Sequence, residues 1–444
     1  MTIPLPQIQN SIANSESYDL SRWGAPIINH QENEEAGSTW DQDGIHRVCT
    51  GTGTTIDIYL QDYGLLRQIK QAEERVLLVG FTGALTMRNG KPGPFFSGIK
   101  VAKRLKLPLL AVADPTISKC EELIISWYAG NEDVVNASEI IGRWLDKLAH
   151  YYKARLLLFG GSAGGFGALS VLPYLTSQAD CLVWNPQTSI ARYMPKFVLH
   201  YLKHGFAKKF ARIDTKAAVT REDLRGFLEE TGVRHDLQSN YRIPENVNLL
   251  FVQNNSDWHV KSHALPFLRN LKVYDDSEEL IDRNHGNISV RVGNFGRGHI
   301  APNKNTINAC LKYLMDPEKN AIDASIFNSF LVNSPDNNGK VASSNSRSSQ
   351  QGGLFPSTDD FEISARQEGR TIVAQIDIRP GVFISPTFAF YFLKEGKRKK
   401  IRSYNADNTA TFEDTGESDF LYVVGFVADD GIRIFKKVRV NTRA

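Results

Sequence analysis

The segment LLLFGGSAGGFGALSVLPYL, residues 156–175, contains an apolar run that leads directly into a turn of small residues. The turn is Gly160-Gly161-Ser162-Ala163-Gly164, and a helical pattern follows it at once. Continuous apolar residues predict a strand buried on both faces. Glycines two before and two after the serine let such a strand and helix pass closely, so G-x-S-x-G is more specific here than alone. We expect Ser162 at a strained turn, as an exposed nucleophile.

Two other interpretations of this turn stay open. It could be a glycine-rich connection without chemistry, or one that cradles a phosphate group. The segment lacks G-x-G-x-x-G in phase with the strand, and it lacks the Lys-Ser/Thr of a Walker loop. The helix that begins after Ser162 favours developing negative charge at its N-terminus. A catalytic serine is therefore the interpretation that we prefer.

Further buried strands and amphipathic helices alternate on both sides of this segment. This alternation predicts a doubly wound, mostly parallel α/β sheet over residues 45–320. Residues 189–243 interrupt it with a helical pattern and no strand, which indicates an inserted cap. The expected strands are 54–60, 75–81, 108–114, 155–160, 181–185, 247–253 and 288–293, and the expected helices are 136–150, 164–175 and 303–315.

The two ends of the chain have a different texture. Residues 1–44 are polar and weakly periodic, and we expect an N-terminal extension that wraps or frays. Residues 321–356 are rich in Ser, Asn and Gly and predict a flexible linker. Residues 357–444 contain seven short runs of period two, which indicate an all-β sandwich similar to immunoglobulin or fibronectin modules.

Composition excludes several classes of protein. A chain of 444 residues with 41% hydrophobic and 23% charged residues is typical of globular domains. The net charge of +3 does not suggest nucleic acid as a partner. No basic and apolar leader and no membrane-length apolar window is found, so we expect a cytoplasmic protein without a membrane span. Its oligomeric state is open. The four cysteines lie far apart and are expected to be reduced and mostly buried, without a zinc site: Cys49, Cys120, Cys181 and Cys310.

The nucleophile motif, its context and the strand order resemble the α/β-hydrolase superfamily across about residues 46–316. The resemblance implies an acid after a late strand and a histidine after the last strand. Asp257 and His299 stand at those places, and both follow strand ends, where open parallel sheets place their sites. In this arrangement His299 takes the proton of Ser162 and Asp257 orients the imidazole. The oxyanion would be held by amides of Ala163 and of the Thr82-Gly83 turn.

Each partner has an alternative. Asp257 could be only a helix N-cap, and His299 could be an ordinary loop histidine. His285 competes with His299 but lies before the last strand. His259 and His263 are four residues apart and could bind a metal ion, although no third ligand is evident and we expect no metal site.

The strings ADPT (113–116), SWYAGN (126–131) and WNPQTS (184–189), with the nucleophile and acid segments, resemble bacterial serine esterases and acyltransferases associated with surface polysaccharides. Trp127, Tyr128 and Trp184 are therefore candidates for sugar-stacking walls, with burial in the core as the alternative. Arg192 and Lys196 belong to a basic run in the cap that either binds an anionic substrate or is a solvated helix face. That run also contains Lys203, Lys208, Lys209, Arg212, His200 and His204.

These residues predict a serine-dependent acyl-ester hydrolase or O-acyltransferase that works through an acyl-enzyme. The substrate is expected to be an ester, possibly on a polysaccharide or another anionic glycan. No cofactor is expected, except acetyl-coenzyme A as the donor if the protein is a transferase. The competing hypothesis is a non-enzymatic module that binds glycan or protein on a hydrolase scaffold.

Overall fold

The computed structural model describes two compact units, Met1–Val341 and Ala342–Ala444. The expected linker, residues 321–356, lies outside the described residues. In the described residues, no helix is both long enough and apolar enough to cross a membrane. The structure describes residues 14–15, 17–68, 75–86, 88, 90–215, 219–316, 361–368, 371–378, 387–394, 397–413, 421–429 and 432–442.

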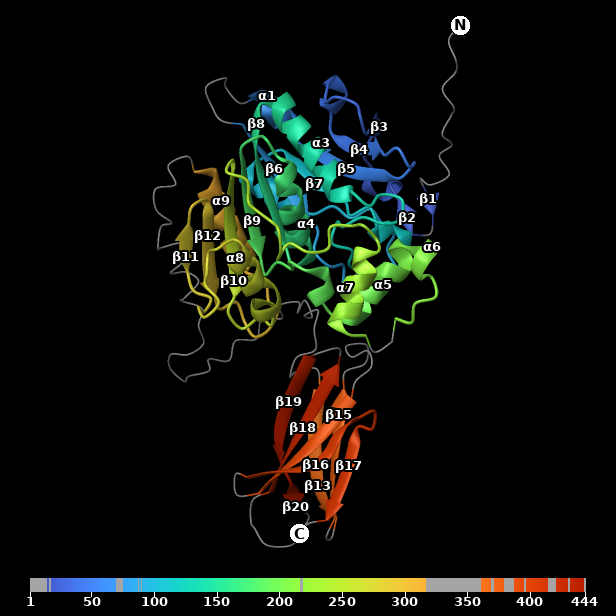
Figure 1. Cartoon of the computed structure of the whole chain (residues 1–444), viewed down its shortest axis with the longest axis vertical. Helices are drawn as coiled ribbons and strands as arrows, with labels where there is room; N and C mark the ends of the chain where they lie inside the picture. The colour runs from blue at the N-terminus through green and yellow to red at the C-terminus, as the bar shows by residue number, and fades with distance from the viewer. Residues whose placement is uncertain are drawn as a thin grey trace. The chain divides into compact units, whose positions relative to one another are not determined.

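The first unit is built on a ten-stranded sheet (Figure 1), whose order is β11-β12-β10-β9-β8-β6-β7-β5-β4-β3. Every strand expected from the sequence is present in it, within a few residues of its expected ends. The bounds are β3 Ile27–Gln31, β4 Gly44–Cys49, β5 Thr55–Gln61, β6 Arg75–Phe81, β7 Leu109–Val112, β8 Ala154–Gly161, β9 Ala179–Trp184, β10 Val247–Asn254, β11 Arg283–His285 and β12 Ile288–Gly293.

The order and directions of these strands define the fold. From β7 to β12 the neighbouring strands are all parallel, whereas β5 is antiparallel to both β4 and β7. Renumbered from β4 to β12 along the chain, leaving out β11, the sheet reads 1-2-4-3-5-6-7-8. A mostly parallel sheet with that order and an antiparallel second strand is the α/β-hydrolase fold, so the expected fold class is confirmed.

Two strands extend the sheet at its edges. β3 pairs in parallel with β4, with Ile27 opposite Ile45. Part of the segment that we assigned to an N-terminal extension is therefore an edge strand of the sheet. At the other edge β11 pairs antiparallel with β12.

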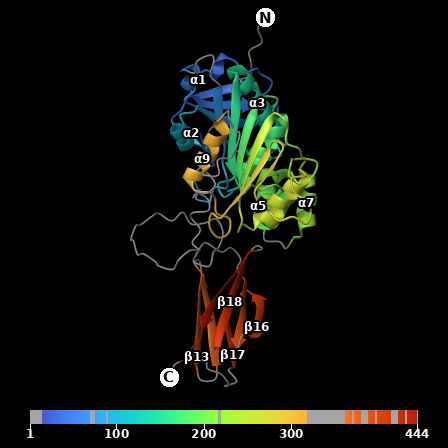
Figure 2. The ribbon, with the colours of Figure 1, turned by 90° about the vertical axis from the view of Figure 1, so that its left-hand side faces the viewer.

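Helices cover both faces of the sheet. α2 (Ile99–Leu105) and α9 (Lys304–Met315) contact each other on one face (Figure 2), and α3 (Ala137–Tyr152) packs with α4 (Ala163–Val171) on the other. The strands present apolar side chains to both layers: Leu77, Leu110 and Leu158 are buried as completely as Leu78, Leu109 and Leu157. Burial on both faces explains their unbroken apolar pattern in the sequence.

The segment between β9 and β10 is helical, as expected for the cap. It contains α5 (Pro195–Gly205), α6 (Ala207–Phe210) and α7 (Arg221–Glu229). α5 buries Val198, Leu199 and Leu202 and leaves its basic residues on the outer side. α7 begins at a capping box in which Thr220 and Asp223 satisfy each other's backbone amides, which fixes its first turn.

The second unit is a β-sandwich of two four-stranded sheets, β17-β14-β13-β20 and β16-β15-β18-β19. Side chains alternate between buried and exposed along β13, as the period of two predicts. The buried residues include Phe361, Ile372, Phe390 and Val423. The bounds are β13 Phe361–Glu368, β14 Thr371–Ile378, β15 Thr387–Lys394, β16 Lys397–Asn405, β17 Thr409–Glu413, β18 Leu421–Asp429, β19 Ile432–Arg439 and β20 Asn441–Thr442.

Candidate active site

Ser162 lies at the turn between β8 and α4, in a backbone conformation that side chains rarely adopt. Its φ is 54° and its ψ is −120°, outside the common regions for a residue other than glycine. The turn is possible because its neighbours lack side chains. A Cβ on Gly160 would lie 2.3 Å from the carbonyl oxygen of Gly164, and one on Gly164 would lie 2.6 Å from that of Phe81. The strain therefore places the Ser162 hydroxyl at the start of a helix, beyond the end of the strand.

The structure brings Ser162, His299 and Asp257 together in one hydrogen-bonded chain. His299 Nε2 is 3.0 Å from Ser162 Oγ, and His299 Nδ1 is 2.6 Å from Asp257 Oδ2. The Asp257 side chain is fully buried and that of His299 is 6% exposed. Both distances lie within hydrogen-bonding range, so a proton can pass from the hydroxyl to the imidazole without rearrangement.

Sheet register explains why the acid and the histidine meet. β10 and β12 are parallel neighbours, with Asn254 opposite Gly293. The loops that follow them, which carry Asp257 and His299, therefore leave the sheet side by side at its carboxyl edge.

Two buried asparagines, which the sequence analysis did not select, hold the histidine loop. Asn254 Nδ2 donates to the carbonyl oxygens of Gly296 and Gly298, at 2.8 and 2.6 Å, and its Oδ1 accepts from the Phe295 amide. Asn185 Nδ2 donates to the carbonyl oxygen of Ile300 at 2.8 Å, and its Oδ1 accepts from the Asn254 amide. The loop is thus fixed on both sides of His299.

His259 fixes the orientation of the acid. Its backbone amide donates to Asp257 Oδ1 at 3.0 Å, which leaves Oδ2 facing His299. Its ring packs edge to face against that of His299, with centroids 4.0 Å apart. Burial, and then the charges of His299 and His263, hold the pKa of His259 well below its usual value. A neutral imidazole therefore stands beside the acid and histidine pair.

The sequence analysis considered His259 and His263 as a pair of metal ligands, but the structure groups His259 with Asp257 and His299 instead. Both rings are fully buried, and His263 Nδ1 accepts from the Thr188 amide at 3.2 Å. The polar atoms of Asp257, His259 and His299 lie within 4.8 Å of one another, close enough to surround an ion. An ion there would compete for the atoms that form the chain to Ser162.

His285 lies exposed in edge strand β11.

The expected oxyanion donors differ in availability. The Thr82 amide donates to Tyr128 Oη at 2.5 Å, and Tyr128 Oη donates in turn to the carbonyl oxygen of Val112. The Thr82 amide is therefore engaged by a buried tyrosine. Gly83 and Ala163 line the same small pocket, and the Ala163 amide is one of the first of α4, which have no acceptor within the helix.

Gln187 is a residue at this site that the sequence analysis missed. Its Nε2 donates to Ser162 Oγ at 3.0 Å, and its Oε1 accepts from the indole Nε1 of Trp127. The side chain is fully buried. It lies in the string WNPQTS, which we noted, yet nothing in that string distinguishes this glutamine from a loop residue. Only the fold brings it to the nucleophile.

The pocket beside the serine is small and mostly apolar. Its polar side chains include Asp114, whose two carboxylate oxygens accept from the amides of Thr116 and Tyr128. Burial raises the pKa of this carboxyl. Its walls are Leu85, Phe95, Ile117, Ile124, Ile125, Ser126 and Trp127, and Thr82, Gly83 and Ala163 border it near the nucleophile.

The three proposed sugar-stacking aromatics are placed differently. Trp127 and Tyr128 are 0% and 1% exposed, with their polar atoms used inside the protein. Neither offers a free face to a sugar, so the core alternative holds for both, although Trp127 forms part of the pocket wall. Trp184 is half-buried and stacks on Phe159.

The basic residues of the cap are partly paired. Lys209 Nζ is 2.5 Å from Glu230, and Lys208 Nζ is 3.5 Å from Asp133. Arg192 is exposed and Lys196 is half-buried. Burial, and then the charges of His299, Arg221 and Arg192, hold the pKa of His263 well below its usual value.

An α/β-hydrolase fold with serine, histidine and aspartate in one hydrogen-bonded chain defines the class of this domain.

No family model matches the chain, and no curated protein matches it. Among solved structures, the chain is similar to TT1662 from Thermus thermophilus, with 16% identity over 62% of this chain and 97% of that chain and a TM-score of 0.32. It is also similar to an acetyl xylan esterase from Paenibacillus sp. R4, with 15% identity over 59% and 80% and a TM-score of 0.36. A fibronectin type III-like protein from Clostridium thermocellum covers 19% of this chain and 90% of its own at 16% identity, with a TM-score of 0.15. Likenesses this distant carry no conclusion about substrate.

Proposed function

We propose that the first unit is a serine-dependent enzyme that processes acyl esters through an acyl-enzyme on Ser162. The observation that carries the proposal is the chain from Ser162 Oγ through His299 to buried Asp257, at 3.0 and 2.6 Å. A serine hydroxyl becomes a competent nucleophile when a positioned imidazole accepts its proton, and the imidazole is positioned by a carboxylate.

The reaction would proceed in two halves. Ser162 Oγ attacks the ester carbonyl while its proton moves to His299 Nε2, which forms a tetrahedral intermediate. That intermediate collapses when the bond to the leaving alcohol breaks and the alcohol takes the proton from His299. Water or another hydroxyl then gives its proton to His299 and attacks the acyl-enzyme, and the released product leaves Ser162 protonated again.

The negative oxygen of the intermediate would be held by the amides of Ala163 and Gly83. The Thr82 amide is occupied by Tyr128, so the second donor is assigned to Gly83 rather than to Thr82. Gln187 Nε2, 3.0 Å from Ser162 Oγ, adds a third polar hydrogen next to the reacting atoms. Preorganised donors of this kind are among the largest contributors to acyl transfer.

The pocket supports a short, apolar acyl group. Gly83 and Ala163 border it, and the rest of its wall is formed largely by aliphatic and aromatic side chains. An ester whose carbonyl oxygen points to those two amides would place its acyl chain among Leu85, Ile124 and Ile125. A pocket this small suits an acetyl or similarly short chain better than a fatty acyl chain.

The acceptor is the finer part of the proposal. Hydrolase and O-acyltransferase share every step up to the acyl-enzyme and differ in whether water or a sugar hydroxyl receives the acyl group. An anionic glycan is supported by the basic run of the cap, in which Arg192 is exposed. Acetyl-coenzyme A would be needed only by the transferase.

Turnover of nitrophenyl esters tests the proposal. We expect hydrolysis of nitrophenyl acetate by the full chain, lower kcat/KM for octanoate than for acetate, and loss of both activities in Ser162→Ala. Absence of turnover with every ester would favour the binding module on a hydrolase scaffold. Acetyl-coenzyme A with an acidic polysaccharide then separates the two enzymes: acceptor-dependent release of coenzyme A identifies the transferase, and release at the same rate without acceptor identifies the hydrolase.

A further inference from the structure

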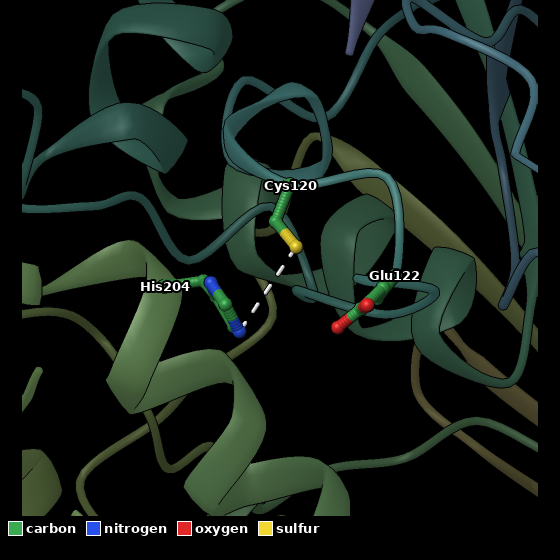
Figure 3. A group of neighbouring side chains, drawn as sticks. All are labelled: Cys120, Glu122 and His204. Atoms are coloured by element: carbon green, nitrogen blue, oxygen red, sulfur yellow. Dashed lines mark hydrogen bonds between the residues drawn. The ribbon is translucent and has the colours of Figure 1, made fainter. Parts of the chain in front are cut away.

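A second group of metal-binding side chains lies outside the site of Ser162 (Figure 3). Cys120 and Glu122 belong to the loop after the short 3₁₀ helix Ile117–Lys119, and His204 lies in the last turn of α5 in the cap. The three side chains point toward one another, and their ligand atoms all lie within 4.8 Å. Cys120 Sγ and His204 Nε2 are 3.9 Å apart. The group therefore joins two segments that are far apart in the sequence.

We propose that Cys120, Glu122 and His204 bind a divalent transition-metal ion, with Zn²⁺ the best match. Thiolate, imidazole and carboxylate are the three ligand types of protein zinc sites. In a tetrahedral site, Zn–S and Zn–N bonds of about 2.3 and 2.0 Å separate the sulfur from the nitrogen by about 3.5 Å. The observed 3.9 Å needs only a small side-chain adjustment to reach that value. The ion would replace the weak contact between thiol and imidazole.

His200 supplies a fourth donor next to the three. It lies one turn before His204 on α5, and its Nε2 is 3.8 Å from Glu122 Oε2. The rings of His200 and His204 are 4.5 Å apart and nearly perpendicular. Histidines at i and i+4 on one helix face are a common way to hold one ion from a single helix. His200 or a water molecule would complete the coordination shell.

The charges of the ligands suit a cation in a basic neighbourhood. Lys196 and Lys203 lie on α5 together with the two histidines, and both would repel an ion that only histidines held. A Cys120 thiolate and the Glu122 carboxylate together bring two negative charges, which balance a divalent ion. Magnesium and calcium prefer oxygen ligands and do not match a sulfur and nitrogen set.

The position of the group gives the ion a structural role. The loop that contains Cys120 and Glu122 is flanked by Ile117 and by Ile124 and Ile125, which line the pocket beside Ser162. A bound ion would tie this wall to helix α5 and so hold the cap closed against it. The site is separate from Ser162 and does not depend on the proposed acyl chemistry.

Metal titration of the full chain tests the proposal. After removal of metal with a chelator, Zn²⁺ is titrated in competition with a chromophoric chelator, and Co²⁺ is added separately as an optical probe. We expect one ion per chain and a thiolate-to-cobalt charge-transfer band. Cys120→Ser should abolish that band, and Cys120→Ser and His204→Gln should each weaken zinc binding about 100-fold or more. Cys49→Ser and His150→Gln are the matched controls and should bind as the unmodified chain does.

The His299→Gln variant tests whether the ion binds at the other group of ligand atoms instead of at Cys120. The polar atoms of Asp257, His259 and His299 are also close enough to surround an ion. Retained stoichiometry and retained charge-transfer band in His299→Gln support the site at Cys120. Binding that is lost in His299→Gln but kept in Cys120→Ser overturns the proposal, as does absence of binding in the unmodified chain. Circular dichroism of each metal-free variant establishes that it is folded before its affinity is compared.

Discussion

The first unit contains two groups of polar side chains that the fold positions with different precision. One surrounds Ser162 and the other surrounds Cys120. Around Ser162, the Asp257 side chain is fully buried and every member of the chain is within hydrogen-bonding distance of the next. Around Cys120, the Glu122 side chain is 80% exposed and the thiol to imidazole distance is 3.9 Å. The first group is already arranged for proton transfer. The second has polar atoms within 4.8 Å of one another that make only long contacts, and it is there that we propose an ion.

The difference follows from the elements that carry the side chains. Asp257 and His299 follow two parallel strands that pair in register. The side chains of Asn254 and Asn185 hold the loop that carries His299. Cys120 and Glu122 lie on a loop, and His204 lies on the inserted cap. Side chains on loops that directly follow paired strands are held within the tolerance that acid–base chemistry needs, whereas side chains divided between a loop and the cap are held less tightly.

The largest expected effect separates the two groups most clearly. Ser162→Ala should lower kcat/KM for nitrophenyl acetate by about 10⁴-fold or more, because the variant has no nucleophile. Ser239→Ala, which removes an exposed hydroxyl of the cap, should change the rate less than 2-fold. A Ser162→Ala protein that keeps a tenth of its activity would show that another group attacks the ester.

A slightly smaller loss is expected from the acid. Asp257→Asn should lower kcat by about 10³- to 10⁴-fold at neutral pH, since the amide cannot hold the imidazole in the tautomer that accepts the serine proton. Its KM should change little. Asp275→Asn, an exposed aspartate, is the matched control. Near-normal kcat in Asp257→Asn would mean that the 2.6 Å contact with His299 has no part in catalysis.

A moderate effect is expected at Gln187. Gln187→Ala removes the donor 3.0 Å from Ser162 Oγ, and kcat should fall about 10- to 100-fold with KM nearly unchanged. The exposed Gln178→Ala should have no effect. If Gln187→Ala raises KM and leaves kcat intact, the glutamine serves substrate binding and does not act on the reacting atoms.

The smallest effect concerns stability toward acid. Burial lowers the pKa of His263 below its unfolded value of about 6.5, so in mildly acidic solution the unfolded chain binds a proton that the folded chain does not. Stability should therefore fall as the pH drops below about 6.5, by at most about 1.4 kcal/mol per pH unit for this residue. His263→Gln should lose less stability than the unmodified chain between pH 7.5 and 5.5, as measured by urea unfolding. Equal losses in the two proteins would contradict the assignment.

Much of this arrangement follows from local sequence. The apolar run 75–81 coincides with β6, because strands buried on both faces must be continuously apolar. The turn around Ser162 is partly local: Gly160 is required by an approach of 2.3 Å within the turn, whereas Gly164 is required by an approach of 2.6 Å to Phe81 on β6. The edge strand β3 was not expected, because its sequence is polar and only half covered.

The features that sequence did not predict depend on contacts between distant segments. The Tyr128 hydroxyl accepts a hydrogen bond from the Thr82 amide, 46 residues away in the sequence. The indole of Trp127 donates to Gln187, 60 residues away, and so orients its side chain. Cys120 and His204 are 84 residues apart. The local signs of that second group are the spacing of Cys120 and Glu122 and that of His200 and His204, and neither distinguishes it from an ordinary loop and a basic run.

The central claim is that the Ser162 hydroxyl is a nucleophile activated by His299. Reaction with a fluorophosphonate, followed by intact-mass measurement and peptide mapping, tests it most directly. We predict a single adduct on Ser162, formed by the unmodified chain, absent from Ser162→Ala and strongly slowed in His299→Gln. A folded chain that forms no adduct, or one that forms it on another residue, would contradict this account.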